Sequence, residues 1–216
     1  MFNSRIQFWK SNGFAPTCIY DIGANKGEWS ATMKQFFPDA KYELFEANAD
    51  NLPDIAPYKP HIILLGNENK DGIPFYKTHF QFNTGNSMFL EVSNVFGESN
   101  YTTVHLPMRT LDTVIQEKSL MVPDFVKLDV QGAELAILQG MTNTLPHVKY
   151  FQIEVSLHRW NKDAPMAEEI ITFMTSKGYF MVDILEYHMI HGYTAQVDFL
   201  FAHASTGLRK ENFYDC

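Results

Sequence analysis

The sequence predicts an α/β fold with a doubly wound, mostly parallel sheet and helices on both of its faces. Strands and helices alternate over the first two thirds of the chain, which is typical of parallel sheets covered by crossover helices. A loop of small residues follows the first strand and opens a helix, where such sheets bind nucleotide-like ligands. The last two strands share a short connection, which allows only an antiparallel pair.

Composition and charge limit the kind of protein. A chain of 216 residues with 45% hydrophobic residues is long enough for one domain with a sizeable core. The net charge of −8 argues against a nucleic-acid partner, because phosphate binding requires clustered Lys and Arg. We expect no secretory signal and no membrane span, which would need about 20 apolar residues. Cys18 falls in a predicted buried strand and Cys216 is the last residue, so we expect a reduced, cytoplasmic protein.

The first half of the chain supplies most of the predicted strands. Residues 1–16 are expected to form an N-terminal helix or arm that ends at Gly13 and Pro16. The domain itself is expected over residues 17–204, with a polar C-terminal tail over 205–216. The apolar pattern predicts strands 18–22, 41–46, 61–66, 73–77 and 102–108, and helices 28–36 and 48–54.

The second half begins with a helix from residue 109, with Thr110 or Asp112 as its N-cap. Gly140 is expected at the left-handed position that commonly ends a helix, and Gly178 ends the next helix. The pattern predicts strands 124–130, 149–155, 179–185 and 196–203, and helices 131–139 and 165–177.

The loop Asp21–Gly27 departs from the dinucleotide fingerprint, because Asn25 and Lys26 stand where glycine and free spacing are expected. Its order, Asp-x-Gly-Ala-Asn-x-Gly, resembles motif I of class I S-adenosylmethionine (SAM) methyltransferases. In that family the loop holds the methionine part of SAM and the acid lies near its amino group. The resemblance implies cofactor contacts from Asp21, Gly23, Ala24, Asn25 and Gly27. The alternative is a tight strand-to-helix turn that binds no ligand.

An acid one strand after such a loop commonly binds ribose hydroxyls, and Glu46 ends the next strand, 19 positions after Gly27. A surface carboxylate with no ligand is the alternative. The strand 61–66 opens into a polar loop over 67–72, and loops at the carboxyl ends of strands line the ligand crevice. Asn67 and Glu68 are therefore candidate neighbours of the adenosine.

The stretch from Lys127 to Glu134, Lys-Leu-Asp-Val-Gln-Gly-Ala-Glu, resembles the FkbM family of SAM-dependent methyltransferases, together with the upstream Thr110-Leu111-Asp112. The resemblance covers roughly residues 19–202. It implies the Rossmann-like class I methyltransferase fold, a seven-stranded sheet with an antiparallel last strand. Many members carry Glu where this chain has Gln131, so we assign that position no essential role. The family is linked to O-methylation of hydroxyls on sugars, polyketides and other small molecules.

Methyl transfer to a hydroxyl requires donor and acceptor at near-attack distance and removal of a proton. Asp129 is predicted at the carboxyl end of a strand, where it could orient the hydroxyl, accept its proton, or bind a cation with Glu154. His158 is the candidate histidine base, although a lone loop histidine is more often polar surface. Glu134 is as well explained by the helix dipole as by catalysis. Two carboxylates do not define a metal site, and we expect no obligatory metal.

Residues 79–100 form a long segment rich in Asn, Ser and Gly, which we interpret as a lid over the substrate pocket; an insertion without a role is the alternative. The expected partner is a small-molecule or carbohydrate acceptor, and the choice between a monomer and a homodimer stays open. Two other functions compete with methyl transfer. One is a non-catalytic module on the same fold that binds SAM or a protein partner. The other is an NAD-dependent sugar oxidoreductase.

Overall fold

A seven-stranded sheet forms the centre of the computed structural model, which describes residues 1–79, 85–92 and 100–208. In spatial order its strands are β3 (His61–Ile62), β2 (Lys41–Glu46), β1 (Cys18–Ile22), β7 (Phe125–Leu128), β8 (Tyr150–Ser156), β10 (Tyr193–His203) and β9 (Tyr179–Ile190). Neighbours from β3 to β8 are parallel, and β10 is antiparallel to both β8 and β9. The predicted Rossmann-like fold is confirmed.

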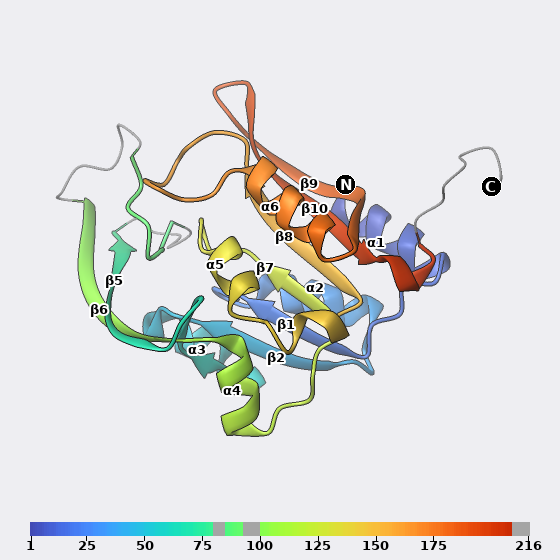
Figure 1. Cartoon of the computed structure of the whole chain (residues 1–216), viewed down its shortest axis with the longest axis horizontal. Coiled ribbons are helices and arrows are strands. Elements are labelled where there is room, and N and C mark those ends of the chain that lie inside the picture. Colours follow the sequence, from blue (N-terminus) through green and yellow to red (C-terminus); the bar gives the residue numbers. More distant parts are fainter. Residues whose placement is uncertain (80–84, 93–99, 209–216) are drawn as a thin grey trace.

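Helices cover both faces of this sheet (Figure 1). One face packs against α4 (Leu111–Lys118), α5 (Glu134–Gln139) and α6 (Ala167–Ser176). The other packs against α1 (Phe2–Ser11) and α2 (Glu28–Phe36), and α3 (Leu52–Ile55) lies over β2. Short 3-10 turns are η1 (Ala49–Asn51), η2 (Ala56–Tyr58), η4 (Leu145–His147) and η5 (Ala204–Thr206). Within the described parts of the chain, no helix has the length and apolar character needed to cross a bilayer.

The N-terminal segment is a helix and belongs to the core. Ile6 of α1 and Phe14 after it are fully buried, in the cluster that also holds Met33 of α2. The Asp183 carboxylate on β9 accepts hydrogen bonds from Arg5 Nε and Trp9 Nε1, both at 2.6 Å. The segment predicted as a helix or arm is therefore an integral layer of the domain.

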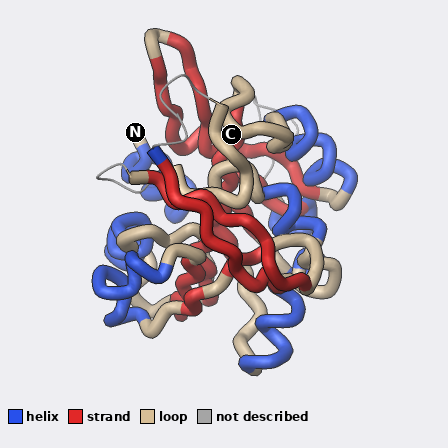
Figure 2. The backbone as a smooth tube through the Cα atoms, turned by 90° about the vertical axis from the view of Figure 1, so that its left-hand side faces the viewer, coloured by secondary structure: helices blue, strands red, loops and turns tan. Residues whose placement is uncertain are grey.

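The predicted strand 61–66 is wrong in one respect, because the chain leaves the main sheet at Ile63. Residues before it form β3 beside β2, and residues after it form β4 (Leu64–Leu65) in a second sheet. That sheet has the order β4-β6-β5, with β6 (Tyr101–Arg109) antiparallel to β5 (Lys70–Thr78). Figure 2 looks onto the side of the molecule that carries β5 and β6. Since β5 begins at Lys70, the polar loop predicted over 67–72 is shorter than expected.

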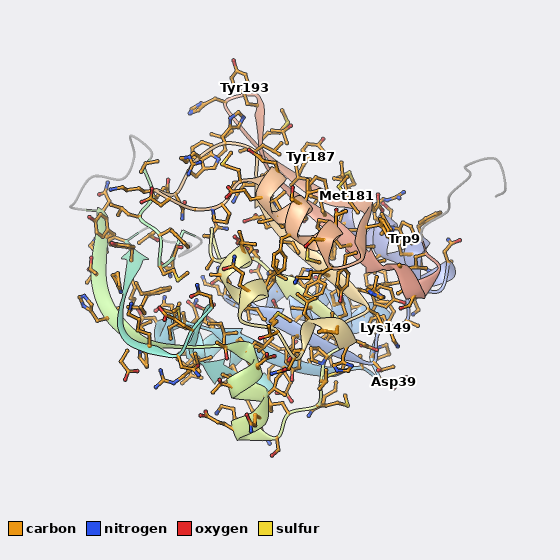
Figure 3. All side chains as sticks on the ribbon, viewed as in Figure 1. Trp9, Asp39, Lys149, Met181, Tyr187 and Tyr193 are labelled. Carbon is orange, nitrogen blue, oxygen red and sulfur yellow. The ribbon has the colours of Figure 1, made fainter. Side chains whose placement is uncertain are left out.

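The last two strands are longer than predicted and form a hairpin that projects beyond the body of the molecule (Figure 1). Their outer ends carry exposed side chains, including Tyr187 and Tyr193 (Figure 3). These residues bury no continuous face, so they lack the period-two pattern from which strands were predicted. Hydrogen bonding between the two strands, rather than burial, extends the hairpin.

Two predictions about the helix after β7 are corrected. It begins at Glu134 rather than at residue 131, because Gln131 and Gly132 have positive φ values of 55° and 106°. Gly140 does not adopt the expected left-handed conformation, since its φ is −78°. A Cβ there would lie 2.2 Å from the backbone oxygen of Gly66. Close approach of two backbone segments therefore requires glycine at position 140.

Candidate active site

The predicted glycine loop lies at the carboxyl ends of β1, β2 and β7. The backbone N–H groups of Gly23 and Ala24 both donate to the Phe45 oxygen, at 2.9 and 3.1 Å, and tie the loop to the end of β2. A Cβ on Gly23 would stand 1.9 Å from the Asp129 backbone oxygen, so only glycine allows β7 to approach. Gly27, with φ 77°, then precedes α2. The sequence pattern thus marks a real junction of three strands.

A cavity of about 400 Å³ opens beside this loop, within the range usual for small-molecule sites. Its apolar walls come from β1, β2, β4, β5 and α5. Its polar lining residues come from the strands and from the loops and turns beside them: Asn25, Glu46, Asn51, Asn86, Asp129, Gln131, Glu154, His188 and Gln196. The structure therefore brings Gly23, Asn25, Glu46, Asp129 and Glu154 together around one space, as expected from the sequence.

Glu46 is 7% exposed and lies on the cavity wall. Its two carboxylate oxygens accept hydrogen bonds from Asn25 N at 2.8 Å and Asn48 N at 2.7 Å. Burial raises the pKa of Glu46, although these two donors oppose the shift. Each oxygen keeps a second lone pair for a ligand hydroxyl. The side-chain oxygen of Asn25 is buried with no hydrogen-bond partner in the described structure, so it can accept a hydrogen bond from a polar ligand.

Asp21 lies deeper than the cavity wall. It is fully buried, accepts a hydrogen bond from Ser30 Oγ at 2.6 Å, and has Lys127 Nζ 3.5 Å from Oδ1. It does not line the cavity, so its contribution to a cofactor amino group would be made at longer range. The described contacts show a second role, in which Asp21 joins α2 to the strands β1 and β7.

Asp129 directly follows β7, and Glu154 lies on the neighbouring strand β8. Burial opposes ionisation of Asp129, but Lys127 Nζ at 3.2 Å and other donors hold its pKa below the usual range. Burial and the charge of Asp129 raise the pKa of Glu154 well above its usual value. Gln131 Nε2 bridges the two carboxylates, at 3.0 Å from Asp129 and 2.7 Å from Glu154. The pair therefore favours one proton and one negative charge.

Two residues that were not predicted from the sequence complete this end of the site. Asp198 on β10 stands directly opposite Glu154 in the strand register, and its carboxylate accepts a hydrogen bond from Gln152 at 2.7 Å. Burial, with Asp129 nearby, raises the pKa of Asp198 to about 6. His188 on β9 places Nε2 3.8 Å from Glu154 Oε1. A signal for Asp198 existed in the sequence, since it is a lone acid among the apolar residues of the strand 196–203.

Several predicted site residues lie elsewhere. His158 is exposed and its ring faces Tyr193 at 6.4 Å, away from the cavity lining. Asn67 lines a different pocket, and Glu68 is exposed beside Lys70. Ala24 and Gly27 shape the loop without lining the cavity.

Glu134, for which the sequence left a structural and a catalytic role open, is buried and accepts hydrogen bonds from the backbone N–H groups of Val130 and Gly132, at 3.0 Å each. Burial raises its pKa to about 7. These contacts close the turn after β7 and give Glu134 a structural function.

The segment interpreted as a lid, 79–100, lies partly outside the described residues, which omit 80–84 and 93–99. The described middle part, 85–92, forms part of the cavity wall through Asn86 and Met88. Ser87 pairs with Tyr76 of β5, and its Oγ donates to the Gln131 oxygen at 2.8 Å. Closure over a bound acceptor stays a prediction.

Comparison with solved structures finds methyltransferases of low sequence identity. The magnesium protoporphyrin IX methyltransferase of Synechocystis PCC 6803 with bound SAH is 9% identical, with a TM-score of 0.50 over 94% of this chain and 81% of that chain. The precorrin-6y C5,15-methyltransferase of Geobacter metallireducens GS-15 is 14% identical, with a TM-score of 0.47 over 93% and 88%. No curated protein matches the sequence.

The family comparison is more informative than these distant structures. The sequence profile described as the methyltransferase FkbM domain matches residues 21–181, which include the glycine loop, Glu46, Asp129 and Glu154. The cavity, the Gly23 junction and the orphaned Asn25 oxygen fit the cofactor of that family. The chain belongs to the FkbM family of methyltransferases, and its cofactor is S-adenosylmethionine.

Proposed function

We propose that this protein transfers the methyl group of SAM to a hydroxyl oxygen of a small molecule or a sugar. The observation that carries the proposal is the pair Asp129 and Glu154, which shares one cavity with Glu46 and the glycine loop. A hydroxyl loses a proton when it is methylated, so a carboxylate beside the reacting oxygen matches this acceptor class.

Different residues of the cavity would bind SAM and the acceptor. Glu46 would accept hydrogen bonds from the ribose hydroxyls, and Asn25 offers a free amide oxygen next to it. SAM supplies a methyl group on a positively charged sulfur, which leaves with the electron pair of the broken bond. Asp129 would orient the acceptor hydroxyl toward that methyl group and receive its proton. Alignment of the two reactants supplies much of the rate enhancement, because the step becomes effectively unimolecular.

The test uses methyl-labelled SAM with a panel of sugars, nucleotide sugars and aromatic or aliphatic alcohols. The expected product carries the label as an O-methyl group, which the chemical shift of a ¹³C-methyl distinguishes from N- and C-methylation. A label found only on nitrogen, carbon or sulfur would show that the acceptor class is wrong. No methyl transfer to any acceptor, despite tight SAM binding, would favour the non-catalytic module.

Asp129→Asn tests the catalytic role of this carboxylate. The substitution keeps the size of the side chain and removes its charge and basicity, so kcat should fall by about 10²–10⁴-fold. The Kd for SAM should change little, because a group that acts on the acceptor makes no ground-state contact with the donor. A large fall in melting temperature together with lost SAM binding would assign Asp129 to the fold instead.

We also infer a reducing compartment, such as the cytoplasm, for this enzyme. Among the described residues, Cys18 is a buried thiol with no disulfide partner, and burial raises its pKa to about 12. Cell fractionation with an antibody against the protein would test this placement.

A further inference from the structure

We propose that Glu154, His188 and Asp198 form a binding site for a divalent transition-metal cation beside Asp129. These residues lie on three neighbouring strands: His188 and Asp198 on the hairpin of β9 and β10, and Glu154 on β8, more than 30 residues earlier in the chain. Their potential ligand atoms all lie within 4.8 Å of one another. The proposal changes our expectation from the sequence, which had considered only the pair of Asp129 and Glu154 and predicted no obligatory metal.

The strand register explains why these side chains converge. Asp198 and Glu154 are direct partners in the antiparallel β8–β10 pair, so they share one face of the sheet. His188 pairs with Gln196, two residues before Asp198, and projects to the same face. Ligand atoms about 2.0–2.2 Å from a cation stand at most about 4.4 Å apart, and the 3.8 Å between His188 Nε2 and Glu154 Oε1 fits this limit. A small side-chain rotation would bring the third ligand, the Asp198 carboxylate, within the same limit.

The charges around the cluster favour a cation. Asp129 directly follows β7, and Glu154 and Asp198 face each other on the next two strands, so these carboxylates repel each other when they are ionised. Lys127 is already within 3.5 Å of both Asp21 and Asp129. Among the described residues, the only basic side chain within 4.0 Å of Glu154 is His188, and no ion pair to Asp198 occurs. Glu154 and Asp198 are 8% and 7% exposed, so water screens them poorly.

Amide side chains hold the two carboxylates in place. Gln131 and Gln196 donate to Glu154 Oε2 at 2.7 and 2.8 Å. Gln152 donates to Asp198 Oδ2 at 2.7 Å. Such outer partners orient metal ligands in proteins, and three neutral amides do so without neutralising the charge. One imidazole nitrogen and two carboxylate oxygens form a mixed donor set. Such a set suits transition-metal cations such as Mn²⁺ better than it suits Ca²⁺, which typically binds oxygen ligands alone.

The position of the site suggests its role, and this part of the inference rests on the proposed function. Glu154 and His188 line the cavity that also holds Asp129, so open positions on the cation would face the acceptor. A cation that binds the acceptor oxygen would lower the pKa of its hydroxyl and hold it in place, as metals do for bound water. Proton transfer to Asp129 would then become easier.

Binding is tested directly, without turnover. The full chain is stripped with EDTA and titrated with Mn²⁺, and free Mn²⁺ is followed by its electron paramagnetic resonance signal. We expect one equivalent bound by the natural protein. His188→Gln and Asp198→Asn should each weaken binding by more than about 10-fold, since loss of even an outer-shell partner typically costs 10–100-fold. His105→Gln, at an exposed histidine on β6, is the matched control and should bind Mn²⁺ normally.

The His188 side chain is 47% accessible, so its substitution should not disturb folding. The test therefore does not depend on whether the variant at the buried Asp198 folds. No Mn²⁺ binding by the natural protein, or unchanged affinity in the His188→Gln variant, would overturn the site. A measurement of labelled methyl transfer in EDTA separates the two proposals. Full O-methylation in EDTA without Mn²⁺ binding would refute the metal site alone. Mn²⁺ binding lost in both variants, with no O-methylation of any acceptor, would refute the proposed function and leave the metal site standing.

Discussion

At the scale of single residues, Gly23 shows most clearly that the backbone conformation of the cofactor loop requires glycine. Both its φ of 81° and the contact with the Asp129 oxygen exclude a side chain. Gly23→Ala should therefore lower the free energy of unfolding by more than about 4 kcal/mol, the range of severe backbone and packing defects, and abolish SAM binding. Urea denaturation and calorimetric titration with SAM measure the two effects.

Gly72 provides a matched control for this substitution. Its φ of 74° is similar, but a Cβ there would meet nothing within 4 Å. Gly72→Ala should cost only the strain of a left-handed residue, about 1–3 kcal/mol. Equal losses in both variants would show that φ alone, and not the close approach of β7, requires glycine at position 23.

Glu46→Gln tests the ribose contact. The amide keeps the shape of the side chain but removes the charge, and hydrogen bonds to charged groups contribute about 1.5–3 kcal/mol. The Kd for SAM should rise by about 10–150-fold, measured by calorimetric titration. Glu43→Gln, on the same strand and bonded to His61 outside the cavity, should leave the Kd unchanged. Unchanged affinity in the Glu46 variant would refute the ribose assignment.

At the scale of elements, the attachment of α1 to β9 depends on one carboxylate. Asp183 accepts hydrogen bonds from both Arg5 and Trp9, and it lies outside the cavity lining. Asp183→Asn should lower the free energy of unfolding by about 1–3 kcal/mol and leave the SAM affinity intact. Urea denaturation followed by tryptophan fluorescence reports the change.

The exposed Asp39, in the turn after α2, serves as the control for that measurement (Figure 3). Asp39→Asn should change the free energy of unfolding by less than about 0.5 kcal/mol. If Asp183→Asn also leaves the free energy of unfolding unchanged, the packing of Ile6 and Phe14 alone holds α1 in place.

Element boundaries also show where sequence patterns lose information. The buried strands β1, β2 and β7 were predicted within two residues of their observed ends, because apolar runs between turns mark them clearly. The break at Ile63 and the outer half of the β9–β10 hairpin were missed. Both depend on backbone partners in another strand: β6, which is distant in the chain, for Leu64 and Leu65, and the adjacent β10 for the end of β9.

At the scale of the whole molecule, ligand binding should stabilise the folded chain by mass action. SAM or its demethylated product at 100 times its Kd should add about 2.7 kcal/mol to the free energy of unfolding and raise the melting temperature. NADH should not, since the loop lacks the dinucleotide fingerprint. Thermal unfolding with each ligand checks this, and stabilisation by NADH alone would revive the oxidoreductase alternative.

The sequence by itself determined the fold class, the cofactor loop and the acid at Glu46, because these depend on local patterns: the period of apolar residues, a glycine at a strand-to-helix junction, and an acid one strand later. It also identified Asp129, from its place at the carboxyl end of a predicted strand, and Glu154 as a possible partner of Asp129. Only the tertiary structure decided the rest of the site. His158 was chosen for its proximity in sequence to Glu154, yet His188 lines the cavity and Asp198 lies beside Glu154, since side-chain direction and cross-strand register bring residues of β8, β9 and β10 together. The register that places Glu154 opposite Asp198 joins β8 to β10, which are separated in the chain by α6 and β9, so the local pattern of either strand does not reveal it.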